Sequence, residues 1–520
     1  MHKYPIGIQN FQELREGGYV YVDKTQYFHQ LVTTGKYYFL SRPRRFGKSL
    51  MISTLQALFE GKKYLFKDLW IEDKWDFEET NPTIVFNFNE MQIKGNDLEI
   101  VLTGDILRQA QQHGIIFEED LSNYNAKSAV LFNLLIKKLH EKTGKKVAIL
   151  IDEYDKPIVD FLDESEKAEI HRDILKSFYG ILKPNDQHIK FLIFTGVSKF
   201  AKVSVFSDLN HLNDITIDGN YSGITGITQN ELEYTFKDEL ITLPILNKVT
   251  NKEFYDDVKK WYNGYSWLGE SVYNPFSLLN FFDKNGIFQN FWFSTGTPTW
   301  LIKQVMKRKE FDFENFDASQ SDLDTFQIDE LNPIALLFQT GYLTIKSYSS
   351  RSMLYTMGYP NQEVRTSLTD HLLQAYRGEN TRSVLPYTYK LSEALENKDL
   401  DKVFSIINTV YSTLPYDLWQ KENERFYHAI LHLTFTLLGT YIQSEIHTAE
   451  GRCDALVQTD KYIYAFDFKI DKTPKEALEQ IKNKGYLKPY QESGKELIAV
   501  GVNFSKQLKG VESWLIGNDF

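Results

Sequence analysis

The chain has 520 residues, of which 42% are hydrophobic and 25% charged, and its formal net charge is −11. This composition is that of a globular protein of several domains and excludes a fibrous or disordered chain. The acidic balance excludes binding of nucleic acid over the whole surface, so such a partner requires a local basic patch. A single cysteine, Cys453, excludes internal disulfides. With no long apolar run and no leader-like segment, the sequence predicts a cytoplasmic protein without a membrane span.

Residues 1–240 alternate short apolar runs with amphipathic stretches. Strands are predicted at 37–40, 83–88, 147–151 and 191–195, and helices at 50–59, 128–139 and 171–179. The strand runs are continuously apolar, which is typical of strands buried on both faces. The alternation with helices therefore predicts an α/β domain around a parallel sheet.

The character of the sequence changes near residues 240 and 400. Residues 241–400 lack buried strand runs and predict a helical lid or linker with aromatic-rich loops. In residues 401–520, helices are predicted at 400–413, 425–438 and 475–485, and strands at 454–458, 462–470 and 497–502. Three domains are therefore expected: 1–240, 241–400 and 401–520.

A candidate phosphate-binding loop follows the first predicted strand. Gly47, Lys48 and Ser49 stand between this strand and a helix, where backbone N–H groups can face a pyrophosphate. Lys48 would reach the β- and γ-phosphates and Ser49 would bind Mg²⁺. Arg42 occupies the position of the usual first glycine. The remaining nucleotide-binding residues predicted in the loop are Arg44, Arg45, Phe46 and Leu50. The two arginines contact phosphates or merely solvate the loop, and the alternative for the whole segment is a basic surface turn whose Ser49 caps the helix.

The strand at 147–151 ends in Asp152 and Glu153. Asp152 is predicted to hold Mg²⁺, mostly through water, and Glu153 to act as the general base. Alternatively, the two carboxylates only mark where a buried strand reaches solvent. The strand at 83–88 fits the P-loop subclass that inserts an additional strand between the two motifs. Thr195, at the end of the next strand, is the candidate γ-phosphate sensor, with Ser198 as second choice, and an ordinary strand-end threonine fits equally well.

The C-terminal region carries a second candidate site. Side chains alternate along a strand, so Asp467 and Lys469 are expected on one face, and Asp454 precedes Asp467 at a spacing that suits a hairpin. Two carboxylates and a backbone carbonyl can hold Mg²⁺, and Lys469 can stabilise a hydroxide or the developing phosphorane charge. The alternative is an exposed hairpin with an Asp–Lys ion pair worth about 0–1 kcal/mol.

Several segments resemble a known family of bacterial proteins. Residues 4–11 (YPIGIQNF), 21–25 (YVDKT) and 42–50 (RPRRFGKSL) resemble an AAA-ATPase-like domain found with a C-terminal PD-(D/E)XK nuclease-superfamily domain. The middle-region segments WYNGY, YNPFS and GTP, at 261–265, 273–277 and 296–298, are similar to that family as well. The resemblance covers nearly the whole chain and implies a P-loop NTPase followed by a restriction-endonuclease-like α/β domain. In this family the loop normally lacks its first glycine.

The resemblance also implies site residues and a function. Asp454, Asp467 and Lys469 match the nuclease motif, Gln480 on the following helix matches a further catalytic position, and Glu445 matches an additional metal ligand. Glu424 resembles another acidic position. The implied function is an ATP-dependent or nucleotide-gated, Mg²⁺-dependent nuclease acting on nucleic acid, with DNA expected, and by family association a role in defence against foreign DNA. A homo-oligomer is compatible with this function.

Two other functions stay open. The chain is then either a signalling or scaffold NTPase whose nuclease-like domain binds without cleaving, or an interaction protein with two relic sites. Lysines near the C-terminal site form either a patch for nucleic-acid phosphates or a solvated helix face. The pair His428 and His432 has zinc-ligand spacing, although histidines on a helix surface or in the core explain it better.

Overall fold

The computed structural model describes residues 2–117, 127–199, 206, 209, 211–293, 302, 305–306, 313–324, 332–377, 383–413, 424–439, 443–445 and 454–517, with only the backbone for 424–428 and 443–445. The chain divides into two compact units. The N-terminal unit comprises residues 1–295 and 314–361, and the C-terminal unit comprises 296–313 and 362–520. The boundaries predicted at 240 and 400 both lie inside a unit, and the three-domain division stays a prediction.

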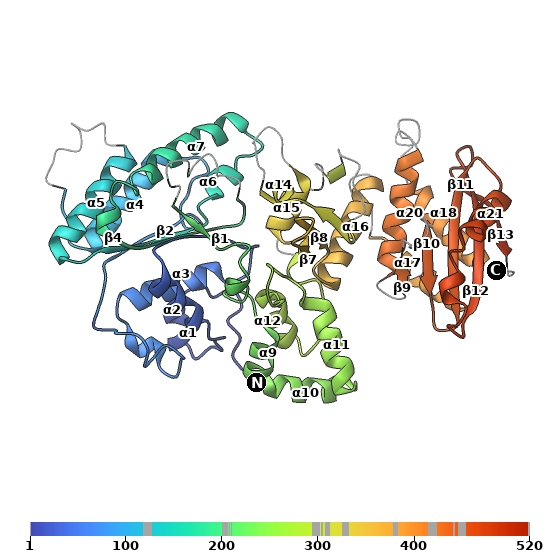
Figure 1. Ribbon diagram of the computed structural model, residues 1–520, viewed down its shortest axis with the longest axis horizontal. Coiled ribbons are helices and arrows are strands. Elements are labelled where there is room, and N and C mark those ends of the chain that lie inside the picture. The colour runs from blue at the N-terminus through green and yellow to red at the C-terminus, as the bar shows by residue number, and fades with distance from the viewer. Residues whose placement is uncertain are drawn as a thin grey trace. The chain divides into compact units, whose positions relative to one another are not determined.

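A five-stranded, all-parallel sheet forms the centre of the N-terminal unit (Figure 1). Its strands are β1 (Tyr37–Ser41), β2 (Thr83–Asn87), β3 (Val147–Asp152), β4 (Ile189–Gly196) and β5 (Asn213–Asp214), in the order β2-β3-β4-β1-β5. The four predicted strands are confirmed. The additional-strand arrangement expected for the sheet is confirmed, because one strand separates β1 from β3. That strand is β4, whereas β2, the strand predicted at 83–88, lies at the sheet edge. The burial agrees with this order, since all but one residue of β4 are buried whereas β2 is partly exposed.

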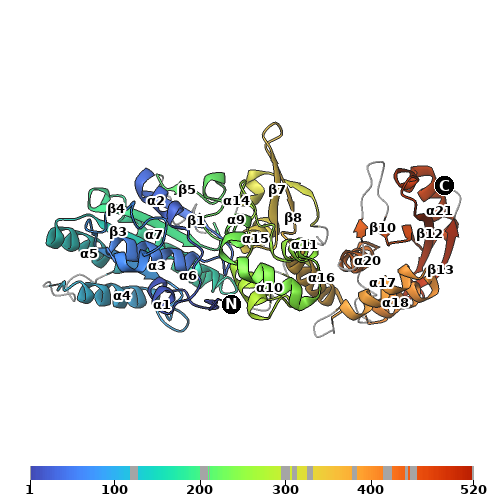
Figure 2. The same cartoon turned by 90° about the horizontal axis from the view of Figure 1, so that it is seen from below.

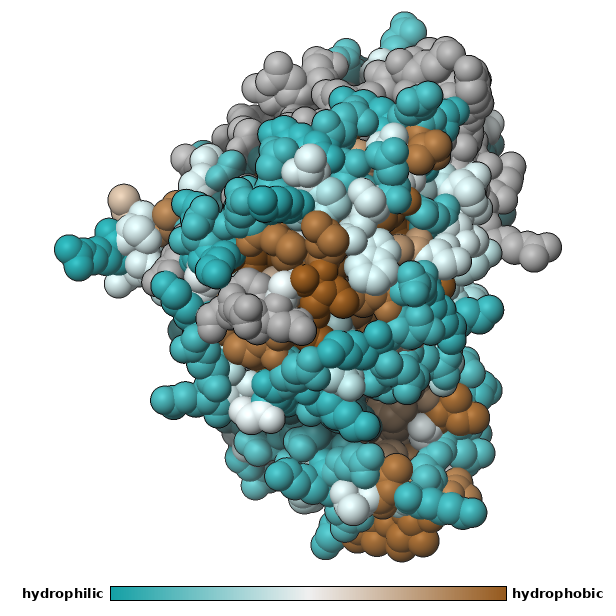
Figure 3. All heavy atoms as spheres, turned by 90° about the vertical axis from the view of Figure 1, so that its right-hand side faces the viewer, coloured by the Kyte–Doolittle hydropathy of each residue, from teal (hydrophilic) through white to brown (hydrophobic). Residues whose placement is uncertain are grey.

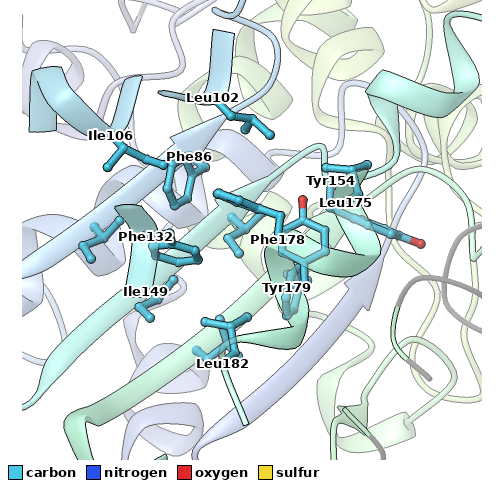
Figure 4. Packing of buried hydrophobic residues seen from close by; sticks show 14 of the residues in the cluster. Phe86, Leu102, Ile106, Phe132, Ile149, Tyr154, Leu175, Phe178, Tyr179 and Leu182 are labelled. Atoms are coloured by element: carbon cyan, nitrogen blue, oxygen red, sulfur yellow. The ribbon is translucent and has the colours of Figure 1, made fainter. Parts of the chain in front are cut away.

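Helices cover both faces of this sheet (Figure 1). One face carries α4 (Leu98–Gln112), α5 (Ser128–Thr143), α6 (Lys156–Val159) and α7 (Ser165–Gly180), and the other carries α1 (Phe11–Glu16), α2 (Thr25–Thr34) and α3 (Lys48–Phe59). Figure 4 shows the core under the first group, where the rings of Phe86, Phe132 and Phe178 lie with centroids 4.8–5.2 Å apart. This packing fixes β2 and β3, and with them the end of β3 that carries Asp152.

The rest of the N-terminal unit contains both helices and strands. Its helices are α9 (Gln229–Thr235), α10 (Lys237–Asn247), α11 (Asn251–Tyr262), α12 (Pro275–Asp283), α14 (Gln320–Asp324) and α15 (Pro333–Thr340). An antiparallel sheet of β6 (Phe316–Ala318), β8 (Leu354–Gly358) and β7 (Thr344–Ser349) lies where the sequence predicts helices and loops only. Figure 2 shows the β7–β8 hairpin projecting from the unit. No apolar run marks this strand in the sequence, because only the first two residues of β7 are buried.

The C-terminal unit has a mixed sheet in the order β13-β12-β11-β10-β9. Its elements are α16 (Gln362–Arg377), α17 (Leu385–Glu396), α18 (Leu400–Ser412), α20 (Glu424–Leu438), β9 (Gln443–Glu445), β10 (Ala455–Gln458), β11 (Tyr462–Ile470), α21 (Pro474–Lys484), β12 (Glu496–Ser505) and β13 (Gly510–Gly517). Strands β11 and β12 are parallel, and the other pairs are antiparallel. The predicted helix–hairpin–helix–strand layout is confirmed, with β9 and β13 in addition.

Helix α21 is the crossover between β11 and β12 and packs against both strands (Figure 2). The approach is close because β12 has a glycine at the contact: a Cβ on Gly501 would lie 2.1 Å from the carbonyl oxygen of Pro474. Gly501 is the register partner of Asp467. The glycine therefore lets α21 bring its side chains to the polar face of β11.

Among the helices of the described ranges, none combines the length and the apolar character that crossing a bilayer requires.

Candidate functional site

The loop between β1 and α3 has the backbone of an anion-binding turn. Gly47, the residue before α3, has φ +86°, and no heavy atom lies within 4 Å of the place that a Cβ would occupy. Arg45 is also left-handed, at φ +67°. The unpaired N–H groups of the first turn of α3 and the positive end of its dipole thus face open space beside the loop.

Lys48 is folded back into this loop. Its side chain is buried, and Nζ donates hydrogen bonds of 3.0 Å to the carbonyl oxygens of Arg42 and Pro43. Burial lowers the pKa of Lys48, and the nearby carboxylates of Glu153 and Asp152 oppose this shift. The loop thus curls around an ammonium that can exchange its carbonyl partners for phosphate oxygens.

Arg42, at the position of the usual first glycine, does not face the loop interior. Its guanidinium donates to the carbonyl oxygens of Ser41 (2.9 Å), Thr216 (2.8 Å) and Tyr221 (3.2 Å), and it lies 3.9 Å from the ring centroid of Trp267. The side chain is fully buried, and burial lowers the pKa of Arg42 to about 9. Arg42 therefore joins the end of β1 to the segment after β5.

The end of β3 places two carboxylates next to the loop. Asp152 is 1% exposed, and its Oδ1 accepts a hydrogen bond from the Thr195 hydroxyl. Among the described residues its Oδ2 has no hydrogen-bond partner. Burial raises the pKa of Asp152, opposed by the hydroxyls of Ser49 and Thr195. A buried carboxylate oxygen with spare acceptor capacity beside a serine hydroxyl is a donor set that fits Mg²⁺.

Glu153 directly follows and has φ +53°, an uncommon conformation for a residue with a side chain. It lines a cavity of about 560 Å³, a size typical of small-ligand sites. The other predicted residues that line this cavity are Arg44, Arg45, Gly47, Lys48, Ser49 and Leu50. The loop, α3 and the end of β3 thus enclose a common space.

Three predicted residues lie behind the cavity wall. Asp152 and Thr195 are buried and bonded to each other. Phe46 is also buried, with its ring 4.7 Å from that of Tyr265. Thr195 therefore orients the Asp152 carboxylate, and the second candidate, Ser198, donates its hydroxyl to Asp155 at 2.7 Å.

Twelve of the nineteen residues that line the cavity were not predicted from the sequence. These residues are Pro5, Ile6, Gly7, Ile8, Gln9, Asn89, Lys94, Lys156, Asp160, Pro275, Phe276 and Leu279. The family-like segments YPIGIQNF and YNPFS contain the first five and two of the last three, and they were the signal that could have placed both segments at the site. Lys94 carried no such signal, because it comes from the connection between β2 and α4.

The second predicted site is assembled on β11 and α21. Asp467 is fully buried, and its Oδ1 lies 2.7 Å from the Lys469 ammonium. The same Nζ donates to Gln480 Oε1 at 2.7 Å. The structure thus brings three of the predicted catalytic side chains together, with the lysine in the middle.

Asp454 lies at the start of β10, next to this group. Its Oδ2 accepts a 2.6 Å hydrogen bond from the N–H of Phe468, the residue between Asp467 and Lys469. Glu445 in β9 is the register partner of Leu456, but its side chain lies outside the described residues, as do those of Cys453 and His428. Within the described part of the chain, no three His, Cys, Asp or Glu residues form a metal-binding group. The described residues fit Mg²⁺ as a pair of carboxylates, with backbone carbonyl and water completing the shell.

Comparison with known proteins finds a family match in each unit. The family model described as "Predicted AAA-ATPase" matches residues 5–206, and the model described as "PD-(D/E)XK nuclease superfamily" matches residues 422–514. The "Uncharacterized protein in vnfD 5'region" of Azotobacter chroococcum mcd 1 is 38% identical over 527 residues, covering 99% of this chain and 98% of that protein. No solved structure matches the chain. The chain therefore belongs to the family of AAA-ATPase-like proteins that carry a PD-(D/E)XK nuclease-superfamily domain at the C-terminus.

Proposed function

We propose that the N-terminal unit binds and hydrolyses ATP with Mg²⁺ and that the C-terminal unit cleaves phosphodiester bonds of nucleic acid, under the control of the bound nucleotide. The observation that carries the proposal is the occurrence of an acid–lysine arrangement in each unit. Lys48 lies with Asp152 and Glu153 in the first, and Lys469 lies with Asp467 and Gln480 in the second.

In the nucleotide site, each side chain has a role that follows from its position. The N-terminus of α3 and Lys48 bind the β- and γ-phosphates. Asp152, held by Thr195, and the Ser49 hydroxyl would hold Mg²⁺, which supplies positive charge on the phosphate oxygens. Glu153, on the cavity wall, orients and deprotonates the attacking water.

In the nuclease site, Asp454 and Asp467 would hold Mg²⁺, which activates water and polarises the phosphodiester. Lys469 stabilises the hydroxide or the charge that develops on the phosphorane. Gln480 accepts a hydrogen bond from Lys469 and so fixes the direction of the ammonium. Gln480 is therefore a positioning residue in this proposal.

The substrate is expected to be nucleic acid because of the charge near this site. Lys472, Lys475, Lys482, Lys484 and Lys488 are exposed on α21 and the segments next to it. Figure 3 shows many hydrophilic residues on this face, around a hydrophobic area near its centre. Exposed lysines on an otherwise acidic chain can bind phosphates locally. The defence role stays a prediction.

The test is a cleavage assay on single- and double-stranded DNA and RNA, with and without ATP, in the presence of Mg²⁺. We expect cleavage of at least one substrate, its loss in Asp467→Ala, and loss of its nucleotide dependence in Lys48→Ala. Glu479→Ala, an exposed neighbour of Gln480, serves as the control variant. ATP binding without cleavage of any of the four substrates contradicts the nuclease half and favours a scaffold NTPase.

A further inference from the structure

Five consecutive residues of the phosphate-binding loop are each contacted by residues 265–341 of the same unit. We call these partners the clasp: Tyr265, Trp267, Phe276, Trp292 and Gly341. The Arg42 guanidinium lies 3.9 Å from the ring centroid of Trp267, and Pro43 packs against Gly341. The Arg44 carbonyl accepts a 3.1 Å hydrogen bond from Trp292 Nε1. The Arg45 guanidinium lies 5.0 Å from the ring centroid of Phe276, and the ring centroids of Phe46 and Tyr265 are 4.7 Å apart.

We propose that the clasp positions the phosphate-binding loop and thereby replaces the backbone freedom that a first glycine supplies in other P-loops. The proposal rests on the proposed binding of ATP. The loop needs an external support because Arg45 is left-handed at φ +67°, which costs a residue with a side chain about 1–2 kcal/mol. Such a conformation persists where the surroundings determine it, and the clasp supplies those surroundings.

Trp292 orients the carbonyl group of Arg44 through a hydrogen bond. It is not one of the residues that line the nucleotide cavity, so the Arg44 carbonyl that it binds is turned away from the cavity. A carbonyl facing the phosphates would repel them, whereas N–H groups attract them. Trp292 is therefore a positioning residue for nucleotide binding.

Gly341 acts on Pro43. It ends α15 with φ +91°, and a Cβ at this position would lie 2.8 Å from the Pro43 ring. The Pro43 carbonyl is one of the two acceptors of the Lys48 ammonium. A side chain at 341 would thus displace the turn that surrounds Lys48.

The first experiment compares Trp292→Phe with Trp261→Phe in the full-length protein, using ATP and ADP with Mg²⁺ as probes. Trp261 stacks on Phe288 with centroids 5.4 Å apart and is not among the residues that line the cavity. We expect nucleotide to change the intrinsic tryptophan fluorescence of the wild type and of Trp261→Phe. In Trp292→Phe we expect most of this change to be lost and the affinity to fall about three- to tenfold, as for loss of one hydrogen bond.

The second experiment compares two glycines that carry the same backbone requirement. Gly144 ends α5 with φ +67°, and a Cβ there meets nothing within 4 Å. Gly144→Ala and Gly341→Ala are both expected to lower the melting temperature. At a temperature where both are folded, only Gly341→Ala is expected to weaken nucleotide binding, by about tenfold or more.

Wild-type affinity and a full fluorescence change in Trp292→Phe, or equal affinities of the two alanine variants, would overturn the clasp proposal alone. A wild-type protein that binds neither nucleotide refutes the proposed function and the clasp with it.

Discussion

Replacing Arg42 by glycine creates the usual phosphate-loop motif, G-x-x-x-x-G-K-S, yet the structure predicts that the protein loses stability. Three backbone carbonyls share the Arg42 guanidinium as their donor, and all of these contacts are buried. At about 1–2 kcal/mol for each buried carbonyl left without this donor, the free energy of unfolding falls by about 3–6 kcal/mol. For a unit of about 340 residues the melting temperature then falls by about 4–8 °C.

The assay is thermal unfolding of the full chain, followed by calorimetry so that the transition of each unit can be resolved, with Arg44→Gly as the control. Arg44 is in the same loop but exposed, so Arg44→Gly is expected to change the melting temperature by only about 1 °C. The transition of the C-terminal unit should stay unchanged in both variants. An Arg42→Gly protein as stable as Arg44→Gly, with undiminished ATP affinity, would refute a structural role for Arg42.

Three further predictions concern single side chains. Burial raises the pKa of Asp152, so its ionised form is disfavoured in the folded, metal-free protein. The stabilising contribution of the protonated form is lost as the pH rises through this pKa. Asp152→Asn should therefore flatten the pH dependence of the melting temperature, and Mg²⁺-ATP should no longer raise the melting temperature of this variant. Lys94→Ala should lower the turnover of ATP and remove any preference for ATP over ADP in a binding titration, since Lys94 lines the same cavity as Glu153. Lys176→Ala, which changes an exposed lysine of α7, should alter neither property. Gln480→Ala should lower the cleavage rate about 10- to 100-fold and shift its pH profile, because the Lys469 ammonium loses a partner, whereas Glu479→Ala keeps the wild-type profile.

Four strands of the parallel sheet could be predicted from the sequence because their buried positions are consecutive and apolar. Strands β1 and β3 are buried at every position, so each appears as an unbroken apolar run. β13 has four exposed residues among its eight and forms an edge strand, so the sequence gives no comparable pattern. Apolar runs thus identify strands that are mostly buried, including the edge strand β2, and miss strands that are defined only by pairing with a neighbour.

In the candidate sites as well, contacts between residues close in the sequence could be predicted, whereas contacts between distant segments could not. The position of Asp467 and Lys469 on one face of the strand could be predicted, because side chains alternate between the two faces of a strand. The partner of Arg42 could not, because Trp267 lies more than 200 residues further along the chain and nothing in either local sequence connects them. Lys94 enters the cavity only because β2 and β3 are neighbours in the sheet. Residues that a site recruits from other elements therefore become visible only in the fold.

In both candidate sites, the lysine ammonium is bound to oxygen atoms of the protein. The Lys48 ammonium is held by two loop carbonyls, and the Lys469 ammonium by Asp467 and Gln480. A fully buried Asp467 carboxylate needs a positive charge nearby, since burial of an isolated charge is costly. In the proposed function, Mg²⁺ held by Asp467 would supply that neutralisation, and Lys469, still bound to Gln480, would be free of Asp467. In that proposal the Lys469 ammonium would stabilise the charge that develops on the phosphate, so the same ion pair would account for stability without metal and for reactivity with it.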